Sequence, residues 1–144
     1  MQKKVIGAGA FIVDEDGKVL LVKHTYGHLN WELPGGGAEN DESPVETALR
    51  EVREETGLIV LAHHMTGYYY LPENDSLHFV FWCEQQDANA VPRSDHAEIS
   101  ECRFWHPEAL PRPISDWTIR RIQNAITGDK YGLPTHIGAR VWLT

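Results

Sequence analysis

The chain has 144 residues, of which 42% are hydrophobic and 24% are charged. That length and balance predict a single domain over residues 1–144 and exclude a wholly disordered or fibrous chain. Thirteen Lys and Arg residues against 21 Asp and Glu residues give a net charge of −8. This charge repels phosphate polymers and anionic membranes, so we expect neither a nucleic-acid polymer nor a membrane as partner. Residues 36–58 hold seven of the acidic residues and two arginines, which suggests a site for cations.

The expected location follows from the cysteines and from hydropathy. Cys83 and Cys102 lack the C-x-x-C spacing of a metal or redox motif. Free thiols are the simplest interpretation, and one disulfide between them is the alternative. No apolar stretch approaches the ~20 residues that span a bilayer. We therefore expect a cytoplasmic protein.

The first third of the chain predicts two strands and a break. Residues 4–13 predict a buried strand, and a turn at Asp16-Gly17 predicts that residues 18–23 return as its antiparallel partner. A polar stretch over residues 25–30 leads to a short segment at 31–33. The sequence Pro34-Gly35-Gly36-Gly37 then predicts a break in regular structure.

The clearest predicted element is a helix between Ser43 and Gly57. Ser43 can cap it, Pro44 suits the first helical position, and Glu46 completes a capping box. Gly57 supplies the C-terminal stop. Side chains at helical spacing predict the buried face, namely Val45, Ala48, Leu49, Val52 and Thr56.

The rest of the chain predicts a sheet and a second helix. Four segments favour strands, at residues 58–62, 68–71, 78–84 and 102–105, with loops at 72–75 and 85–96. A helix is expected over residues 116–127, ending at Gly128, with Ile119, Ile122 and Ile126 facing inward. The tail over residues 131–144 is expected to add an extended segment around 141–143. Together these elements predict a mixed α/β fold, a sheet covered by helices on its faces.

The first helix carries an acidic face that stability does not explain. At about 100° per residue, Glu51, Glu54 and Glu55 lie within roughly 100° of arc. A like-charge pair four residues apart costs about 0.2–0.5 kcal/mol, and the helix dipole disfavours carboxylates in the last turns by about 0.3–1 kcal/mol each. The alternative is a solvated acidic face, but only Arg50 and Arg53 are available to balance it. A hard divalent cation such as Mg²⁺, which prefers oxygen ligands, accounts for the pattern.

The same helix lies within a longer motif. Gly36, Glu42 and the run from Arg50 to Leu58 follow the spacing G-x5-E-x7-R-E-U-x-E-E-x-G-U, where U is aliphatic. This resembles the complete Nudix box over residues 36–58, and all nine specified positions match. Leu33-Pro34-Gly35-Gly36 also resembles family usage. The resemblance implies a Nudix-type α/β/α sandwich, with a mixed β-sheet between helices.

The resemblance also implies an activity, which is hydrolysis of a pyrophosphate bond in a small nucleoside diphosphate derivative. Nucleoside triphosphates, ADP-ribose and sugar nucleotides belong to this class, and water attacks phosphorus with the help of Mg²⁺ or Mn²⁺. A homodimer is one expected assembly. The alternative is a catalytically silent Nudix-fold sensor that binds a nucleotide; retention of every carboxylate in the box argues against it.

Residue roles follow from the resemblance position by position. Glu51, Glu54 and Glu55 would be metal ligands, together with the backbone carbonyl of Gly36. Arg50 would orient Glu51. Two further residues of the box have structural roles, Glu42 in holding the loop against the helix and Gly57 in ending it.

A carboxylate outside the box often joins this site in the family. Glu98 is our candidate, because the segment from Glu98 to Trp105 resembles the one that carries it, and Glu101 is its rival. The alternative for Glu98 is an exposed loop residue.

Substrate contacts are less specific. Lys23 and His24 end the second predicted strand and could reach phosphates. Several aromatic residues could stack on a base, and we select Tyr70 among Trp31, Tyr68, Tyr69 and Trp82. Pro72 resembles a proline of ADP-ribose-cleaving members, but its context is equally typical of a turn.

Overall fold

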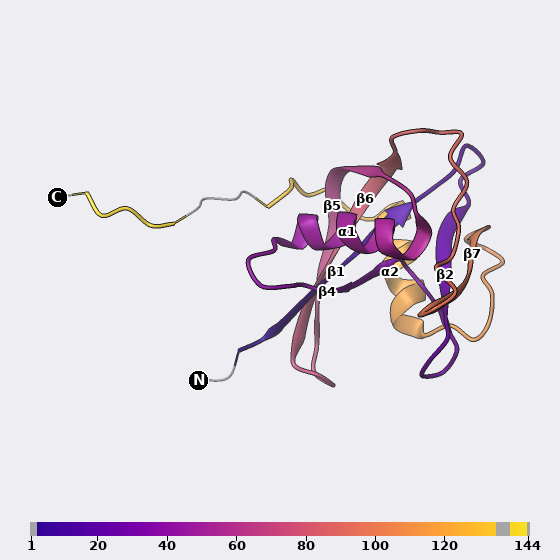
Figure 1. Ribbon diagram of the computed structural model, residues 1–144, viewed down its shortest axis with the longest axis horizontal. Helices are drawn as coiled ribbons and strands as arrows, with labels where there is room; N and C mark the ends of the chain where they lie inside the picture. The colour runs from indigo at the N-terminus through magenta and orange to yellow at the C-terminus, as the bar shows by residue number, and fades with distance from the viewer. Residues whose placement is uncertain (1–2, 135–138, 144) are drawn as a thin grey trace.

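The computed structural model describes residues 3–134 and 139–143. Within these residues, seven strands form two sheets, and two helices pack against them (Figure 1). The first sheet has the order β4-β1-β6-β5 and the second has the order β3-β2-β7. The elements are β1 (Val5–Ile12), β2 (Val19–His24), β3 (Trp31–Glu32), β4 (Gly35–Gly37), α1 (Pro44–Thr56), β5 (Val60–Leu71), β6 (Ser76–Gln85), β7 (Ile99–Trp105) and α2 (Asp116–Thr127).

The first sheet lies between the two helices, which confirms the predicted mixed α/β class. β1 pairs in parallel with β6 and antiparallel with β4. Its side chains alternate between the faces, as a strand requires. Ala8, Ala10 and Ile12 pack with Val52 of α1, whereas Phe11 packs with Ile122 of α2. Two separate cores therefore hold the helices on opposite faces of one sheet (Figure 1).

The predicted hairpin of residues 4–13 and 18–23 is wrong beyond its turn. The turn itself forms, since the Asp14 carboxylate accepts hydrogen bonds from the main-chain N–H groups of Asp16 and Lys18. Only Val13 and Val19 then bridge, and the two strands enter different sheets. Both β1 and β2 are largely buried on both faces. Their apolar sequences therefore require a place inside a sheet but do not specify which strands pair with them.

The predicted break at residues 34–37 is also wrong in part, because Gly35–Gly37 forms the edge strand β4. Gly35 lies opposite Gly9 in the antiparallel pairing with β1. A Cβ atom on Gly35 would approach the carbonyl oxygen of Ala8 to 2.5 Å. Glycine is needed here because the two backbones approach so closely.

Three further expectations change in detail. Residues 60–62 of the first predicted segment and the whole of 68–71 belong to one long strand, β5, which two irregularities in its pairing with β6 interrupt. On α2, Ile122 is buried as predicted but Ile126 is 48% exposed, and Ala125 takes the inward position. Pro72 lies in the turn between β5 and β6.

The tail does not add the expected strand within the described residues. Tyr131 exchanges two main-chain hydrogen bonds with Met65 on β5. Val141, Trp142 and Leu143 are exposed and belong to no strand, while residues 135–138 of the same prediction lie outside the described residues. No helix over the described part of the chain is long and apolar enough to cross a membrane.

Candidate active site

Local sequence fixes the start and end of α1. Ser43 Oγ accepts a hydrogen bond from the main-chain N–H of Glu46, and the Glu46 carboxylate accepts one from the N–H of Ser43. Gly57 ends the helix in the left-handed conformation, with φ of 73°. The predicted capping box and stop are therefore confirmed. They set where α1 begins and ends.

Arg50 gathers the carboxylates of the box. Its guanidinium donates to Glu42 at 2.7 and 2.9 Å, to Glu51 at 2.8 Å and to Glu54 at 3.1 Å. It also donates to the carbonyl oxygen of Gly37 at 3.0 Å. Hydrogen bonds from Arg50 hold the pKa of Glu42 at about 2. The Arg50 guanidinium thus links the loop before α1, the strand β4 and two successive turns of the helix.

Glu51 packs directly against Gly36. A Cβ atom on Gly36 would lie 2.7 Å from the Glu51 carboxylate, so only glycine leaves room for it. Glu51 is half-buried, and burial raises its pKa even though Arg50 acts in the opposite direction. The close approach brings the β4 backbone and this carboxylate to one place, as the box spacing implies.

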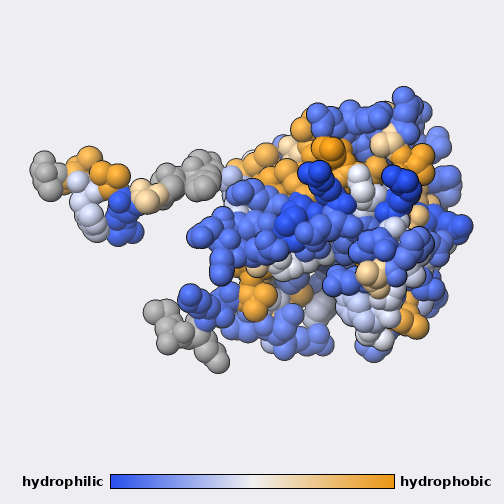
Figure 2. All heavy atoms as spheres, viewed as in Figure 1, coloured by the Kyte–Doolittle hydropathy of each residue, from blue (hydrophilic) through white to orange (hydrophobic). Residues whose placement is uncertain are grey.

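Glu55 lies deeper than the predicted acidic face. It is 5% exposed and accepts a hydrogen bond from the N–H of Gly35 at 2.8 Å. Burial, followed by the charges of Glu51, Glu98 and Asp95, raises its pKa to about 8. Glu54, by contrast, has a side chain that is 57% exposed. Hydrophilic side chains cover the outer side of α1 (Figure 2), and Glu55 is turned away from them toward the core.

The loop before β7 brings Glu98 to this group. Thr25, just after β2, donates from its N–H to the carbonyl oxygen of Glu98 at 2.9 Å and from its hydroxyl to that of Ala97 at 2.8 Å. The Glu98 charge raises the pKa of both Glu51 and Glu55, so its exposed side chain lies near them. The rival Glu101 instead pairs with Arg103 on its own strand at 3.5 Å.

The end of β2 contributes an aromatic pair. His24 is half-buried, which lowers its pKa against the charges of Glu32 and Glu98. The ring of Tyr26 stacks on it, with centroids 4.7 Å apart and planes 10° apart. Burial and the charges of nearby carboxylates, Glu55 first, raise the pKa of Tyr26. Tyr26 is not among the site residues predicted from the sequence, although its place two residues after His24 is a signal for it.

The other two candidate substrate contacts have neighbours of their own, and Tyr70 lies away from α1. The Nζ of Lys23 is 6.0 Å from the centre of the Trp31 ring. The Tyr70 hydroxyl donates to Asp75 at 2.5 Å, and Lys4 lies over the Tyr70 ring. Tyr70 therefore belongs to the far end of the β5–β6 hairpin, where it lines a cavity of about 300 Å³ beside α2.

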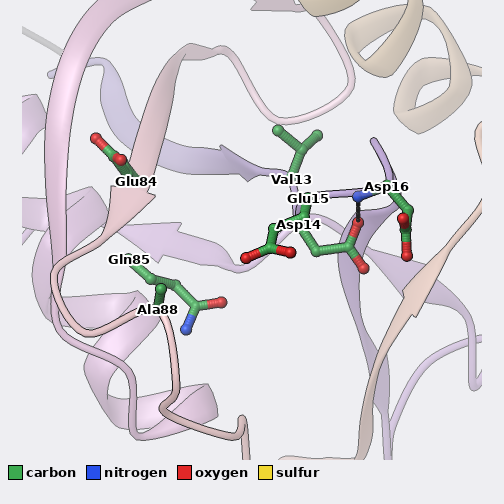
Figure 3. Close-up of a pocket in the computed structure, with 7 residues that line it drawn as sticks. All are labelled: Val13, Asp14, Glu15, Asp16, Glu84, Gln85 and Ala88. Carbon is green, nitrogen blue, oxygen red and sulfur yellow. Dashed lines mark hydrogen bonds between the residues drawn. The ribbon is translucent and has the colours of Figure 1, made fainter.

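A second acidic region stands apart from α1. A cavity of about 430 Å³ lies around the turn after β1. Figure 3 shows the residues that line it, which are Val13, Asp14, Glu15, Asp16, Glu84, Gln85 and Ala88. The Asp14 carboxylate is engaged by the main chain of its own turn, including the Asp16 N–H drawn in the figure. Turn formation therefore accounts for Asp14, and the Glu84 carboxylate bonds instead to His63 at 2.7 Å.

The carboxylates of α1 suit a hard cation without forming a closed cage. Among the described residues, no three His, Cys, Asp or Glu side chains converge as a ready metal site, and the Arg50 guanidinium contacts both Glu51 and Glu54. Mg²⁺ needs only one or two carboxylates when water and substrate phosphates complete its shell. The charges of Glu54 and Glu98 raise the pKa of Glu51, and those of Glu51 and Glu98 raise the pKa of Glu55. A bound cation would relieve this repulsion. The donor set therefore fits the group that the box implies.

Comparison with known proteins places this arrangement in a family. A model of the NUDIX domain matches residues 3–124. A solved Nudix hydrolase from Nitrosomonas europaea has a TM-score of 0.76 and 25% identity, over 95% of this chain and 100% of that one. The α/β fold and the carboxylate-bearing helix are thus those of a Nudix hydrolase, and the chain belongs to this family.

Two relatives by sequence are named more closely. A MutT-like protein of Streptomyces ambofaciens is 28% identical over 133 residues, which cover 92% of this chain and 84% of that protein. An ADP-ribose pyrophosphatase of Methanocaldococcus jannaschii is 38% identical over 66 residues, which are 44% of this chain and 39% of the relative.

Proposed function

We propose that this Nudix hydrolase cleaves a pyrophosphate bond in a small nucleoside diphosphate derivative, such as a nucleoside triphosphate, ADP-ribose or a sugar nucleotide, with Mg²⁺ or Mn²⁺. The observation that carries the proposal is the acidic face of α1, organised by Arg50 and packed against Gly36. The relative named as an ADP-ribose pyrophosphatase supports the same class of bond.

The carboxylates of α1 and the backbone of β4 would hold the cation. Glu51, Glu54 and Glu55 supply oxygen ligands, and Gly36 brings the main chain beside Glu51. When bound, such a cation neutralises the pyrophosphate and lowers the pKa of water. Arg50 fixes the direction of Glu51 through a charge-assisted hydrogen bond at 2.8 Å. Glu42 keeps Arg50 in place, so its role is structural.

Glu98 is the proposed base that takes a proton from the water attacking phosphorus. Its side chain is exposed, and its backbone is fixed to Thr25. His24, whose pKa burial lowers, would meet a substrate phosphate as a neutral hydrogen-bonding group. His24 ends β2 and Glu98 lies in the loop before β7, and the two are near enough for the Glu98 charge to act on the pKa of His24.

A nucleotide panel tests the activity. Purified protein is incubated with Mg²⁺ or Mn²⁺ and with nucleoside triphosphates, ADP-ribose, sugar nucleotides and dinucleoside polyphosphates. We expect release of a nucleoside monophosphate, pyrophosphate or phosphate from at least one of these compounds. No product should form after the divalent metal is removed with a chelator. Tight nucleotide binding without turnover at every metal would instead support the sensor.

A reducing, cytoplasmic location is also proposed. Cys83 is buried and Cys102 half-buried, and both are free thiols. Free buried thiols are usual where cellular reductants keep disulfides from forming. Alkylation of both residues under denaturing conditions, without prior reduction, in protein taken directly from cells would support this location.

A further inference from the structure

The proposed base, Glu98, lies just outside regular structure. β2 ends at His24 and β7 begins at Ile99, and these two residues lie opposite each other at the end of the paired strands. The pairing shifts register by one residue just before them, which leaves Ser100 as an extra residue on β7. Such a bulge bends its strand and redirects the residues next to it. Because the paired strands end here, the position of Glu98 depends on contacts other than the sheet.

The turn that carries Glu98 is shaped by its own residues. The Asp95 carboxylate accepts hydrogen bonds from the main-chain N–H groups of Ala97 and Ile99, at 2.9 and 3.2 Å. His96, next to Asp95, adopts the left-handed conformation, with φ of 60°. These local bonds determine the shape of the turn. They do not attach it to the neighbouring strand, because both partners in each bond belong to the same stretch of chain.

Thr25 supplies that attachment from the end of β2. Its main-chain N–H donates to the carbonyl oxygen of Glu98 at 2.9 Å. Its hydroxyl oxygen lies 2.8 Å from the carbonyl oxygen of Ala97 and 3.2 Å from that of Glu98. The single hydroxyl hydrogen can be donated to either carbonyl. The peptide groups on both sides of Glu98 are thus tied to one threonine.

We propose that Thr25 is a positioning residue, whose hydroxyl holds the Glu98 backbone where the carboxylate reaches the water that attacks phosphorus. The inference rests on the proposed function, in which Glu98 is the base. The Glu98 side chain is exposed, so packing does not hold it and its reach is set by where its backbone is fixed. A base works only within hydrogen-bond reach of the proton that it takes, and a misplacement of about 1 Å can lower the rate by about 10²-fold.

Steady-state kinetics with the substrate found in the nucleotide panel test this role. Thr25→Val keeps the shape and the main-chain N–H but removes the hydroxyl, and Thr25→Ser restores it. Thr127→Val is the matched control, because the Thr127 hydroxyl is also exposed and donates to a carbonyl oxygen, that of Gln123 on α2, at 2.9 Å. Thr25→Val should lower kcat about tenfold, the effect of a misplacement smaller than 1 Å. Its KM, and both constants of Thr25→Ser and Thr127→Val, should change less than about twofold.

A double variant separates positioning of Glu98 from a general structural role. Glu98→Gln alone should lower kcat by about 10²-fold or more, the contribution of a general base. In the Glu98→Gln protein, Thr25→Val should lower kcat by less than about twofold further, because residues that act through one group are not additive. A threonine that only stabilised the fold would lower kcat by the same factor in both backgrounds.

Three results would overturn the role of Thr25. They are an unchanged kcat in Thr25→Val, a kcat of Thr25→Ser as low as that of Thr25→Val, and an equal loss with and without Glu98. If the unmodified protein hydrolyses nothing in the panel, or Glu98→Gln keeps full activity, the proposed function fails instead. Amide hydrogen exchange then decides the attachment alone. Faster exchange of the Ala97 and Ile99 N–H groups in Thr25→Val, but not in Thr25→Ser, supports it, and unchanged exchange overturns it.

Discussion

The pair of Glu42 and Arg50 offers the sharpest test of how the box is held together. Glu42 accepts two hydrogen bonds from Arg50, and further ones from the Thr47 hydroxyl at 2.7 Å and the Glu39 N–H at 3.1 Å. Its side chain is 12% exposed and that of Arg50 is 22% exposed. The substitution Glu42→Gln keeps the shape, removes the charge and leaves Arg50 without its main partner.

The size of the effect follows from the pKa of Glu42. Arg50 and the other donors lower it from 4.5 to about 2, and each pKa unit corresponds to about 1.36 kcal/mol. The ionised carboxylate therefore stabilises the folded state by roughly 3 kcal/mol at pH 7. Because the folded pKa is the lower one, this stabilisation is present above pH 4.5 and is lost as the pH falls toward about 2.

Urea unfolding of the metal-free protein measures this difference. At pH 7, Glu42→Gln should lose roughly 3 kcal/mol of unfolding free energy, and the gap from the unmodified protein should narrow below about pH 5. Glu39→Gln is the matched control, because Glu39 is 3.8 Å from Arg50 and 69% exposed. It should change stability by less than about 1 kcal/mol. A Glu42→Gln loss no larger than the control's, or one that does not narrow in acid, would refute this reasoning.

Three other outcomes are expected. Glu54→Gln should lower kcat by about 10²-fold or more and keep or slightly raise the melting temperature of the metal-free protein. Glu46→Gln, in the capping box, should instead change activity little and lower stability slightly. Full activity of Glu54→Gln would contradict the role of Glu54 as a metal ligand. Gly36→Ala should lower kcat, because its Cβ would meet the Glu51 carboxylate at 2.7 Å, and an unchanged kcat would show that Glu51 can move freely. Burial raises the pKa of Glu55 to about 8, so the metal-free protein should lose stability from pH 5 to pH 8. Melting temperatures in chelator should show this loss in the unmodified protein and less of it in Glu55→Gln.

The helix α1 shows how much of the site was predictable from sequence. Its cap at Ser43, its stop at Gly57 and the spacing of its carboxylates depend on residues within a few positions of each other. Local hydrogen bonds and helical periodicity decide such features, so the sequence displays them directly. The spacing of the Nudix box added Gly36 and Glu42 to the predicted site. The structure shows that Gly36 packs against Glu51 and that Glu42 accepts hydrogen bonds from Arg50.

The partners of the strands were not predictable in the same way. Residues 4–13 and 18–23 are apolar on both faces, and only the packing of the whole chain sends them into separate sheets. The glycine run at 35–37 becomes a strand because β1 presents glycine and alanine opposite it. Each of these choices depends on residues far away in the chain, which a local pattern does not contain.

The sequence by itself determined the acidic helix, its caps and the family to which the motif points. Tertiary structure alone decided which residues outside the box join it: Thr25 and Glu98 are brought together by the β2–β7 pairing, and Tyr70 is carried to the opposite end of a hairpin. It also decided that Glu55 is buried while Glu54 is exposed. The reason is physical: helix formation is fixed by neighbours in sequence, whereas burial and the meeting of loops are fixed by long-range packing.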